Sequence, residues 1–450
     1  MKKIFTILLL LVTVSAFAQT AQWTFVSYLP APNPPVNSIT VPNANTVWVV
    51  CDASGGAARV YKSTNGGVNW LLRNGGLPAV NGYGIFAFDT TTAIVGNTNG
   101  SLYKTTNGGF NWTNVLTVTN SFSNGVHMFN ANYGIYSGDP TGNGAPYQFR
   151  ITTDGGNTWN LAPTAPIASN EFGVINAWDW TDSSHIWIGS ANTIASAPNA
   201  KVYRTSTGYY GTWSNAVVTG TGGSTGCYYQ AVGFINATSG MVGSSGGDLR
   251  KTTDGGVTFT NVTTTPWTAG SVAVINMNAL KDGSNTIRVS VAGDTTRMFK
   301  TTNLGTTWVR EPLPAEATVG QIQHVQFLSA NVGFAGLGAT GGIGGFIKYS
   351  IPTGITPINS NIPAEFSLSQ NYPNPFNPST MIKFSLPKSG NVTLKVYNTI
   401  GKEVETLISE DMSAGTYEVT FDASKLNSGM YFYRLSTNGF SDTKRMMLVK

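Results

Sequence analysis

One short template recurs along most of the chain and limits the folds that this sequence can adopt. Each copy reads Ser/Thr, any residue, Asn or Asp, two residues that are usually glycine, two further residues, and then Trp or Phe. Five copies begin at Ser63, Thr105, Thr152, Thr252 and Thr301, and a degenerate sixth copy begins at Thr205. The closing aromatic residues recur every 42 to 54 residues. That period is typical of one four-stranded blade of a β-propeller.

The residue types within the template are those of a tight hairpin turn. Asn and Asp side chains hydrogen-bond backbone groups two residues on, and glycine adopts positive φ without strain. The amide or acidic positions and the closing aromatics are Asn65 and Trp70, Asn107 and Trp112, Asp154 and Trp159, Asp254 and Phe259, and Asn303 and Trp308. These copies resemble the Asp-box (BNR) repeats of sialidase-like β-propellers. The resemblance implies that each box closes the hairpin between the two outer strands, on the face opposite the ligand site. We therefore interpret Asp154 and Asp254 as turn residues rather than as acids or calcium ligands.

The two ends of the repeat region complement each other. Residues 346–349 read as the strand that elsewhere precedes a box, but no box follows them. Residues 23–30, near the N-terminus, read like the segment that follows the other boxes. The sequence thus predicts an all-β, seven-bladed β-propeller over residues 19–350, in which the N-terminal strand completes the last blade and removes the exposed sheet edges. The composition suits this fold, because 52 glycines and only 10% charged residues favour short strands and tight turns.

The N-terminus reads as an export signal. Lys2 and Lys3 precede an apolar run that ends in small residues at Ala16 and Ala18, so residues 1–18 are predicted to be a cleaved signal peptide. No later segment is apolar for long enough to span a bilayer. The two cysteines, Cys51 and Cys227, fall in blades far apart, which favours free buried thiols over a disulfide.

A second domain follows a linker at residues 351–365. Residues 366–450 contain strands of alternating polarity punctuated by glycine, which predicts a small β-sandwich. This stretch resembles the C-terminal sorting domain (type A) of proteins exported by the type IX secretion system. The matching segments are residues 372–376, 396–398, 414–417 and 428–433, with a basic and apolar tail at 444–448. The resemblance implies that this domain contacts the secretion machinery and that the protein is secreted or displayed on the cell surface.

Charge and motif content exclude several classes of function. Without the two N-terminal lysines the net charge falls from +5 to +3 with no basic run, so no nucleic-acid partner is expected. The three histidines, His127, His185 and His324, lack metal-ligand spacing, and no cofactor fingerprint occurs in a suitable context, so neither a metal nor a cofactor is expected. His127 stands where other repeats have Phe86 or Val232, which favours a core or channel histidine.

Two functions remain for the loops on the predicted ligand side. Sialidase chemistry is disfavoured, because Arg150, Arg204 and Arg250 occupy a repeated strand position just before boxes and no Arg-Ile-Pro segment occurs. The preferred hypothesis is a monomeric, non-catalytic binding propeller for a polysaccharide or protein; the alternative is a glycoside hydrolase or lyase that uses loop carboxylates. Aromatic rings suit either ligand, since they stack on sugars and anchor interfaces. The candidate ligand-binding residues are Tyr83, Phe122, Phe172, Tyr228, Tyr229, Trp267, Asp52, Asp139, Glu171 and Asp294, with Asp248 and Glu316 as further loop acids.

Overall fold

The structure is a computed structural model. It describes residues 21–53, 57–192, 199–219, 228–318, 320–338, 344–350, 356–359, 363–412, 414–424, 426–437 and 439–450, with the backbone alone at 199, 219, 356–359 and 409–411. The expected signal peptide, Cys227 and most of the expected linker lie outside these residues. Cys51 is a buried free thiol, and burial raises its pKa well above the ordinary value. The described part of the chain has no helix long and apolar enough to cross a membrane.

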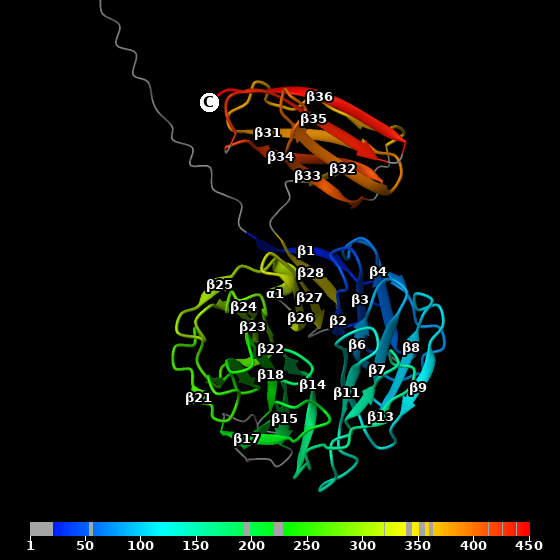
Figure 1. Ribbon diagram of the computed structural model, residues 1–450, viewed down its shortest axis with the longest axis vertical. Helices are drawn as coiled ribbons and strands as arrows, with labels where there is room; N and C mark the ends of the chain where they lie inside the picture. The colour runs from blue at the N-terminus through cyan, green and yellow to red at the C-terminus, as the bar shows by residue number, and fades with distance from the viewer. Residues whose placement is uncertain are drawn as a thin grey trace, which may run out of the picture.

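Seven four-stranded antiparallel sheets occupy the first 350 residues (Figure 1). The first three sheets are β2 (Val36–Thr40), β3 (Val47–Cys51), β4 (Arg59–Ser63) and β5 (Leu71–Leu72); β6 (Gly82–Ala87), β7 (Ala93–Asn97), β8 (Ser101–Thr105) and β9 (Thr113–Thr117); and β10 (Ser123–Met128), β11 (Gly134–Gly138), β12 (Arg150–Thr152) and β13 (Asn160–Leu161). The next three are β14 (Glu171–Trp180), β15 (Ile186–Asn192), β16 (Asn199–Thr205) and β17 (Ser214–Thr219); β18 (Tyr229–Phe234), β19 (Gly240–Ser244), β20 (Leu249–Thr252) and β21 (Thr260–Asn261); and β22 (Ala273–Ala279), β23 (Ile287–Ala292), β24 (Thr296–Thr301) and β25 (Val309–Glu311). The last is β26 (Gln321–Ser329), β27 (Val332–Gly338), β28 (Gly345–Ser350) and β1 (Gln22–Tyr28), and a short helix, α1 (Ala315–Thr318), precedes β26.

The sheets form a closed ring. Their first strands in chain order, β2, β6, β10, β14, β18, β22 and β26, contact one another in sequence, and β26 returns to contact β2. We call these seven strands the inner strands. β1 joins the last sheet from the other end of the chain, pairing antiparallel with β28 from Gln22↔Ser350 to Tyr28↔Gly345. In Figure 1 the colours run around the ring until blue β1 meets yellow β28.

The apolar core lies between neighbouring sheets. Val50 of β3 and Ile85 of β6 belong to one buried cluster, and Ile135 of β11 and Ile188 of β15 belong to another. Because both faces of each sheet are covered by its neighbours, the second strands are buried along nearly their whole length, as in Val47–Cys51.

The repeated template forms the turn between the third and fourth strands of six sheets. In five copies the first hydroxyl accepts a hydrogen bond of 2.8–3.0 Å from the amide of the residue four positions on. The same hydroxyl donates to the Asn or Asp of its own turn over 2.7–3.0 Å. Gly155 and Gly156 have φ of 74° and 84°, and Leu304 accepts φ of 50° where the first glycine is missing.

Asp154 and Asp254 act within these turns. Asp154 accepts hydrogen bonds from the amides of Asn157 and Thr158, both at 3.0 Å. The bond from the Thr158 amide is the main reason that the pKa of Asp154 falls to about 2, and hydrogen bonds from Thr258 likewise lower the pKa of Asp254. Both carboxylates are thus held by local donors.

Replacement of a closing aromatic residue should destabilise the packing between neighbouring sheets of the ring. Trp159 is 8% exposed and packs in a cluster with Ile94 of the preceding sheet. Trp159→Ala should lower the free energy of unfolding by about 3–5 kcal/mol, whereas Leu161→Ala, at a 62% exposed position two residues on, should change it by less than about 0.5 kcal/mol. Chemical denaturation measures both. Ligand affinity per folded molecule should be unchanged in both variants. A loss of affinity without a loss of stability would contradict the structural role of the closing aromatic residues.

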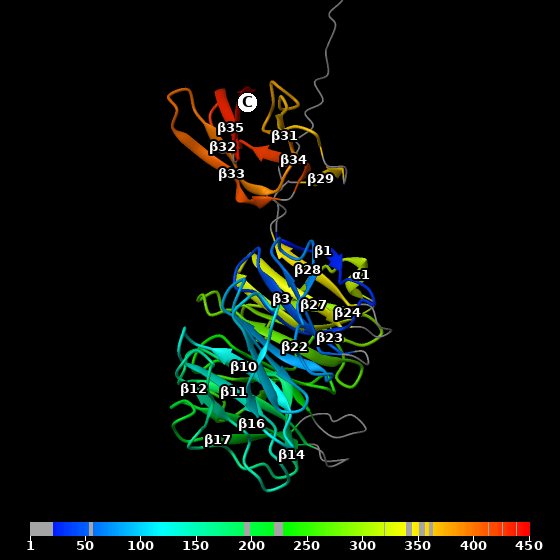
Figure 2. The same cartoon turned by 90° about the vertical axis from the view of Figure 1, so that its right-hand side faces the viewer.

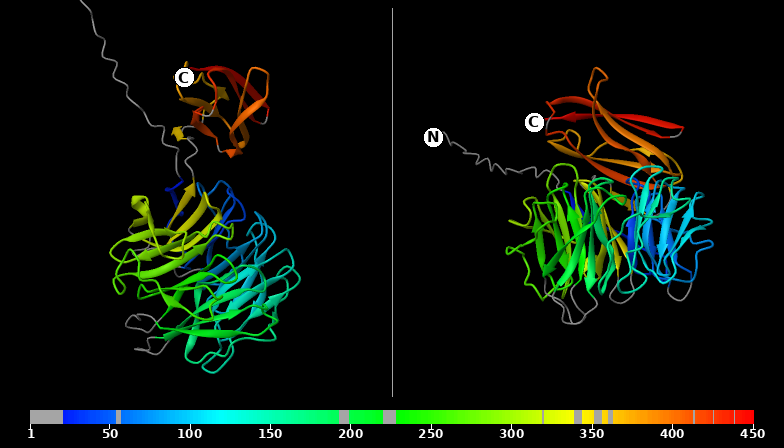
Figure 3. Two further views of the ribbon diagram at one scale, coloured as in Figure 1. Left: turned by 60° about the vertical axis from the view of Figure 1, so that its left-hand side comes forward. Right: turned by 60° about the horizontal axis from the view of Figure 1, so that its bottom comes forward.

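Two further sheets follow near the C-terminus (Figures 2 and 3, yellow through orange to red). One contains β29 (Thr356–Asn359), β34 (Gly415–Asp422), β31 (Ser379–Leu386) and β30 (Ser367–Leu368), and the other contains β33 (Glu403–Met412), β32 (Gly390–Tyr397), β35 (Gly429–Thr437) and β36 (Phe440–Leu448). The two sheets share one apolar core, to which Phe384, Val396, Val419 and Leu435 contribute. This core contains no residue of the ring.

Candidate functional site

The loop residues singled out from the sequence lie at one edge of the ring. Each one lies at or before the start of an inner strand, or after the end of the second strand of a sheet. Antiparallel pairing brings these two kinds of segment to the same side. We call this side, where the inner strands begin, the starting edge, and the opposite side the ending edge.

Four candidate carboxylates at the starting edge, Asp52, Asp139, Glu171 and Asp294, are engaged by protein groups. Asp52 accepts from the Asn37 amide at 2.8 Å, and Asp139 accepts from the Asn124 amide at 2.7 Å. Asp139 also accepts from the backbone N–H of Gly173 in the next sheet, at 2.7 Å, and burial raises its pKa to about 6.

The remaining two carboxylates form ion pairs. Glu171 pairs with Lys201 at 2.8 Å, and Asp294 pairs with Arg297 at 2.7 Å. None of these carboxylates lines the central cavity described below.

The candidate aromatics at this edge divide into two groups. Tyr83 and Phe122 are half-buried with ring centroids 5.1 Å apart, and Phe172 and Tyr228 lie 6.0 Å apart. Tyr229 is fully buried. Trp267 is 8% exposed, packs on Phe299 and Trp308, and donates its indole N–H to a backbone carbonyl. The structure therefore places Tyr229 and Trp267 in the core, where their rings serve packing between sheets.

The inner strands share an irregularity near the starting edge. Six of them have one extra residue there, which turns side chains away from the regular alternation; these residues are Asn37, Tyr83, Asn124, Gln230, Ile275 and Gln323. In the seventh, β14, the register runs from Gly173↔Ser190 to Trp178↔Ile188, so residues 174–177 stand opposite Gly189 alone. We call residues 174–177 the β14 bulge.

The β14 bulge crosses the axis of the ring. Asn176, with φ of 59°, donates its side-chain amide to the Asn37 carbonyl at 3.0 Å. Its amide oxygen lies 3.3 Å from the hydroxyl of Ser38. Both partners belong to β2, three sheets away, so the bulge spans the ring between β14 and β2 at the starting edge.

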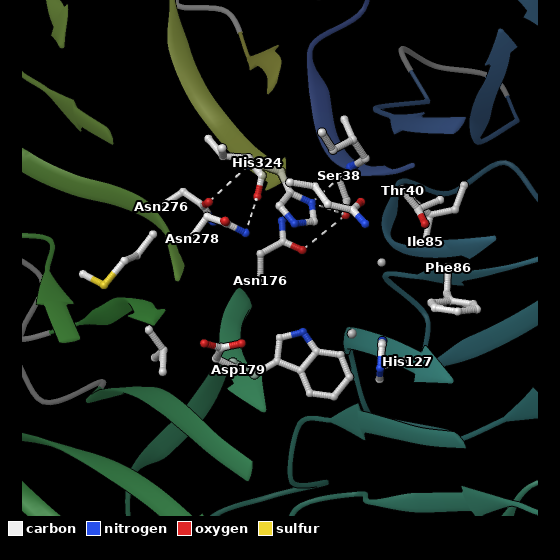
Figure 4. Close-up of a pocket in the computed structure, with 18 of the residues that line it drawn as sticks. Ser38, Thr40, Ile85, Phe86, His127, Asn176, Asp179, Asn276, Asn278 and His324 are labelled. Atoms are coloured by element: carbon white, nitrogen blue, oxygen red, sulfur yellow. Dashed lines mark hydrogen bonds between the residues drawn. The ribbon is translucent and has the colours of Figure 1, made fainter. Parts of the chain in front are cut away.

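Beyond the bulge, a cavity of about 170 Å³ lies on the axis of the ring, lined by residues of the inner strands (Figure 4). One wall is aromatic: His127 lies with its ring centroid 5.2 Å from Phe86 and 3.8 Å from Trp180. The other wall is polar and carries Asn276, Asn278, His324 and Gln326. The sequence pattern predicted His127 in the core or channel, and the structure confirms this position. The sequence pattern did not indicate the polar wall.

Both histidines in the cavity are uncharged at neutral pH. The backbone N–H of Ile39 donates to Nδ1 of His324 at 3.1 Å, and the Ser38 hydroxyl lies 2.8 Å from the same atom. Because a backbone N–H can only donate, Nδ1 must be the unprotonated nitrogen and the ring proton sits on Nε2. Burial lowers the pKa of His324 to about 4 and that of His127 to about 3.

This burial predicts a loss of stability in mild acid. An unfolded histidine takes up its proton near pH 6.5, whereas the two folded rings remain neutral to about pH 4, so the unfolded state gains stability as the pH falls. Asp139 opposes the trend, because its raised pKa lets the folded state bind a proton first. His127→Phe introduces the residue type that Phe86 provides at the matching position of its own strand. Between pH 7 and pH 5 the free energy of unfolding should fall by roughly 2 kcal/mol less in this variant than in the wild type. Urea titrations at the two pH values measure it; equal pH dependence in wild type and variant would contradict the prediction.

One ion pair borders the cavity. Asp179 accepts from Lys281 at 2.6 Å and from the backbone N–H of Phe234 at 2.7 Å. Asp179 is the one acidic residue in the lining, and the described part of the chain contains no group of three or more metal-ligating side chains. The cavity can therefore stack and hydrogen-bond a ligand, but it offers no second carboxylate for acid–base chemistry.

Comparisons with known proteins identify the C-terminal region and the fold of the ring. Residues 370–450 match the family of secretion system C-terminal sorting domains. That domain marks proteins exported by the type IX secretion system, so this protein is destined for the cell surface or the extracellular space, and its tail interacts with the secretion machinery. No curated protein sequence matches the chain.

Solved structures similar to the chain include β-propellers. YCF48 from Cyanidioschyzon merolae superposes with a TM-score of 0.54 at 19% identity, over 73% of this chain and 99% of YCF48. A structure of YCF48 bound to a D1 peptide gives 0.52 at 14% identity, over 75% and 99%. The GH74 xyloglucanase from Xanthomonas campestris gives 0.48 at 11% identity, over 81% and 59%. The YCF48 likeness shows the propeller fold for the ring and, at these identities, nothing about its activity.

Proposed function

We propose that this protein is a non-catalytic binding propeller that the type IX secretion system delivers to the cell surface or the medium. In this proposal residues 19–350 form a seven-bladed propeller with Asp-box turns, and residues 366–450 form a β-sandwich that serves as the sorting domain. The central cavity is the binding site, and the ligand is a polysaccharide or a protein.

The observation that carries the proposal is the chemistry of the cavity wall. Aromatic rings face amide groups across a space that holds no pair of carboxylates. A glycosidase needs two carboxyl groups roughly 5–10 Å apart. Asp52, Asp139, Glu171 and Asp294 at the starting edge are engaged locally, and Asp179, the one acid of the cavity lining, is paired with Lys281. Such a wall supports recognition rather than hydrolysis. The peptide bound to YCF48 supports keeping a polypeptide among the possible ligands.

The test is binding without turnover by the exported protein. Purified from the cells that secrete it, the protein should retain a glycan from an array, or a surface protein, and release the ligand intact after prolonged incubation. Chromatography of the ligand before and after detects any cleavage. Shortened glycan products would contradict the non-catalytic proposal, and retention of neither a glycan nor a protein would refute binding itself.

A further inference from the structure

We infer that the central cavity takes the terminal ring of a neutral glycan, one uncharged pyranose that enters from the ending edge. This inference rests on the proposed binding function and names the class of its ligand. Four features carry it: the aromatic wall, the unpartnered polar groups, the absence of free charge, and the closure of the cavity at the starting edge.

The aromatic wall offers ring surfaces against which the C–H groups of a sugar ring pack, with Phe86 perpendicular to His127 and His127 tilted by 32° on Trp180. Phe86, His127 and Trp180 follow one another around three neighbouring inner strands (Figure 4 labels Phe86 and His127). Trp178 completes the wall by lying over Gly125, where a Cβ atom would approach its indole to 2.6 Å. A pyranose has one such C–H face and a rim of hydroxyls, so it needs polar groups opposite the rings.

The polar wall supplies both donors and acceptors. The Oδ1 atom of Asn278 is buried without a hydrogen-bond partner. His324 carries its proton on Nε2, as its Nδ1 contacts require. Gln326 accepts from the Val41 N–H through Oε1 at 2.9 Å, which leaves its NH₂ group as a donor. Hydroxyl groups both donate and accept, so a sugar satisfies all three side chains.

The balance of charge selects a neutral ligand. Both histidines are neutral, and Asp179 is matched by Lys281 at 2.6 Å. A carboxylate on the sugar would therefore be buried without a counter-charge, which is costly. A phenylalanine side chain of a peptide would stack equally well, but it has no donor for the Oδ1 atom of Asn278, and an unmade buried hydrogen bond also costs affinity.

The β14 bulge determines from which side the ligand enters and which part of it binds. The open side is the ending edge, which carries the template turns, and not the side of the loop residues that the sequence pattern favoured. Asn176 bonded to Asn37 closes the axis at the starting edge, so a polysaccharide chain cannot thread through the ring. At the ending edge, Phe88 and Phe129 are half-buried and Leu328 is 40% exposed. A space of about 170 Å³ admits one sugar ring, so the ring must be the end of its chain.

Calorimetric titration of the exported protein with the methyl pyranosides of glucose, galactose and mannose tests the inference. At least one should bind saturably, while methyl glucuronide, which adds one carboxylate, should bind at least about tenfold more weakly than the glucoside. Asn278→Ala should weaken binding about tenfold at unchanged stability, because the lost oxygen has no partner in the free protein and the Asn278 Nδ2 bond is long at 3.4 Å. Phe86→Leu should weaken binding by a similar factor.

Matched variants at the starting edge complete the design. Phe122→Leu removes an equivalent ring, and Gln323→Ala removes an amide of the same inner strand as Gln326; both should leave the affinity unchanged. A monosaccharide whose binding is lost in Phe122→Leu but kept in Asn278→Ala would overturn the inference and leave the proposed function intact. If no neutral pyranoside binds but a protein or peptide is retained, the inference is overturned and the proposed function is kept. An exported protein that retains no glycan and no protein refutes the proposed function itself.

Discussion

Deletion of residues 19–30 should open the ring and make the protein aggregate. These residues contain β1, which enters the ring from the far end of the chain and covers the edge of β28 along six residue pairs. Without β1, β28 presents a free edge of N–H and C=O groups, and such edges pair with other chains. Size-exclusion chromatography should show oligomers, and the thermal transition should be lowered or lost.

The deletion also removes a buried contact of the neighbouring sheet. The indole N–H of Trp23 donates to Glu311 at 2.9 Å, and Glu311 is paired with the buried Arg288 at 3.0 Å. Loss of one member of a buried polar network leaves its partners unsatisfied, which costs more than the contact contributed. Opening of the ring and loss of this network therefore both lower the stability of the deletion variant.

A milder variant separates ring opening from loss of the network. Trp23→Phe keeps an aromatic ring against Phe327 and Tyr349 but cannot donate to Glu311. It should stay monomeric with a lower unfolding temperature, whereas the deletion should aggregate. A deletion variant that remains monomeric with unchanged melting would contradict closure by the N-terminal strand.

The turns could be predicted from the sequence because their chemistry is local. Ser63, Asn65 and Gly67 bond one another within five residues, so their types and spacing carry the whole conformation. The pairing of β1 with β28 was also predictable, because the two ends of the repeat region each lack what the other has. Comparison of the repeats with one another thus predicted a contact between segments that lie far apart in the sequence.

The central cavity could not be predicted in the same way. Nothing in Glu171–Trp180 marks a four-residue bulge, because the segment has no proline and its only glycine, Gly173, lies just before it. The conformation of Asn176 depends on Asn37 and Ser38, more than 130 residues away. No local pattern records such a partner.

The structural role of the engaged acids could be predicted in part from the sequence. Asp52 and Asp139 each follow a bonded asparagine, Asn37 and Asn124, by 15 residues, and each pair occupies the same place in its sheet. That repeated spacing is a signal that the sequence carries for a structural role. For Trp267, by contrast, the sequence marks a loop aromatic, and only the packing of Phe299 and Trp308 shows that the ring is covered.

Removal of residues 366–450 should stop export at the periplasm. The region matches the sorting-domain family from residue 370 to the end of the chain, whereas the expected N-terminal signal peptide carries a protein across the inner membrane alone. The truncated protein should accumulate inside the outer membrane and be almost absent from the medium and the cell surface. Fractionation followed by immunoblotting measures the distribution, with a periplasmic enzyme as the marker.

The truncated protein should still be folded, because the tail and the ring have separate cores. The buried cluster of residues 368–448 includes no residue of the seven ring sheets, so its loss uncovers no apolar surface between the sheets of the ring. The retained protein should therefore resist proteolysis and melt as the full chain's ring does, which separates an export defect from a folding defect. The converse experiment attaches residues 366–450 to a reporter that carries a signal peptide, and that reporter should reach the outside in a host with the secretion system. Equal amounts of truncated and full-length protein outside the cells would contradict the role of these residues in sorting.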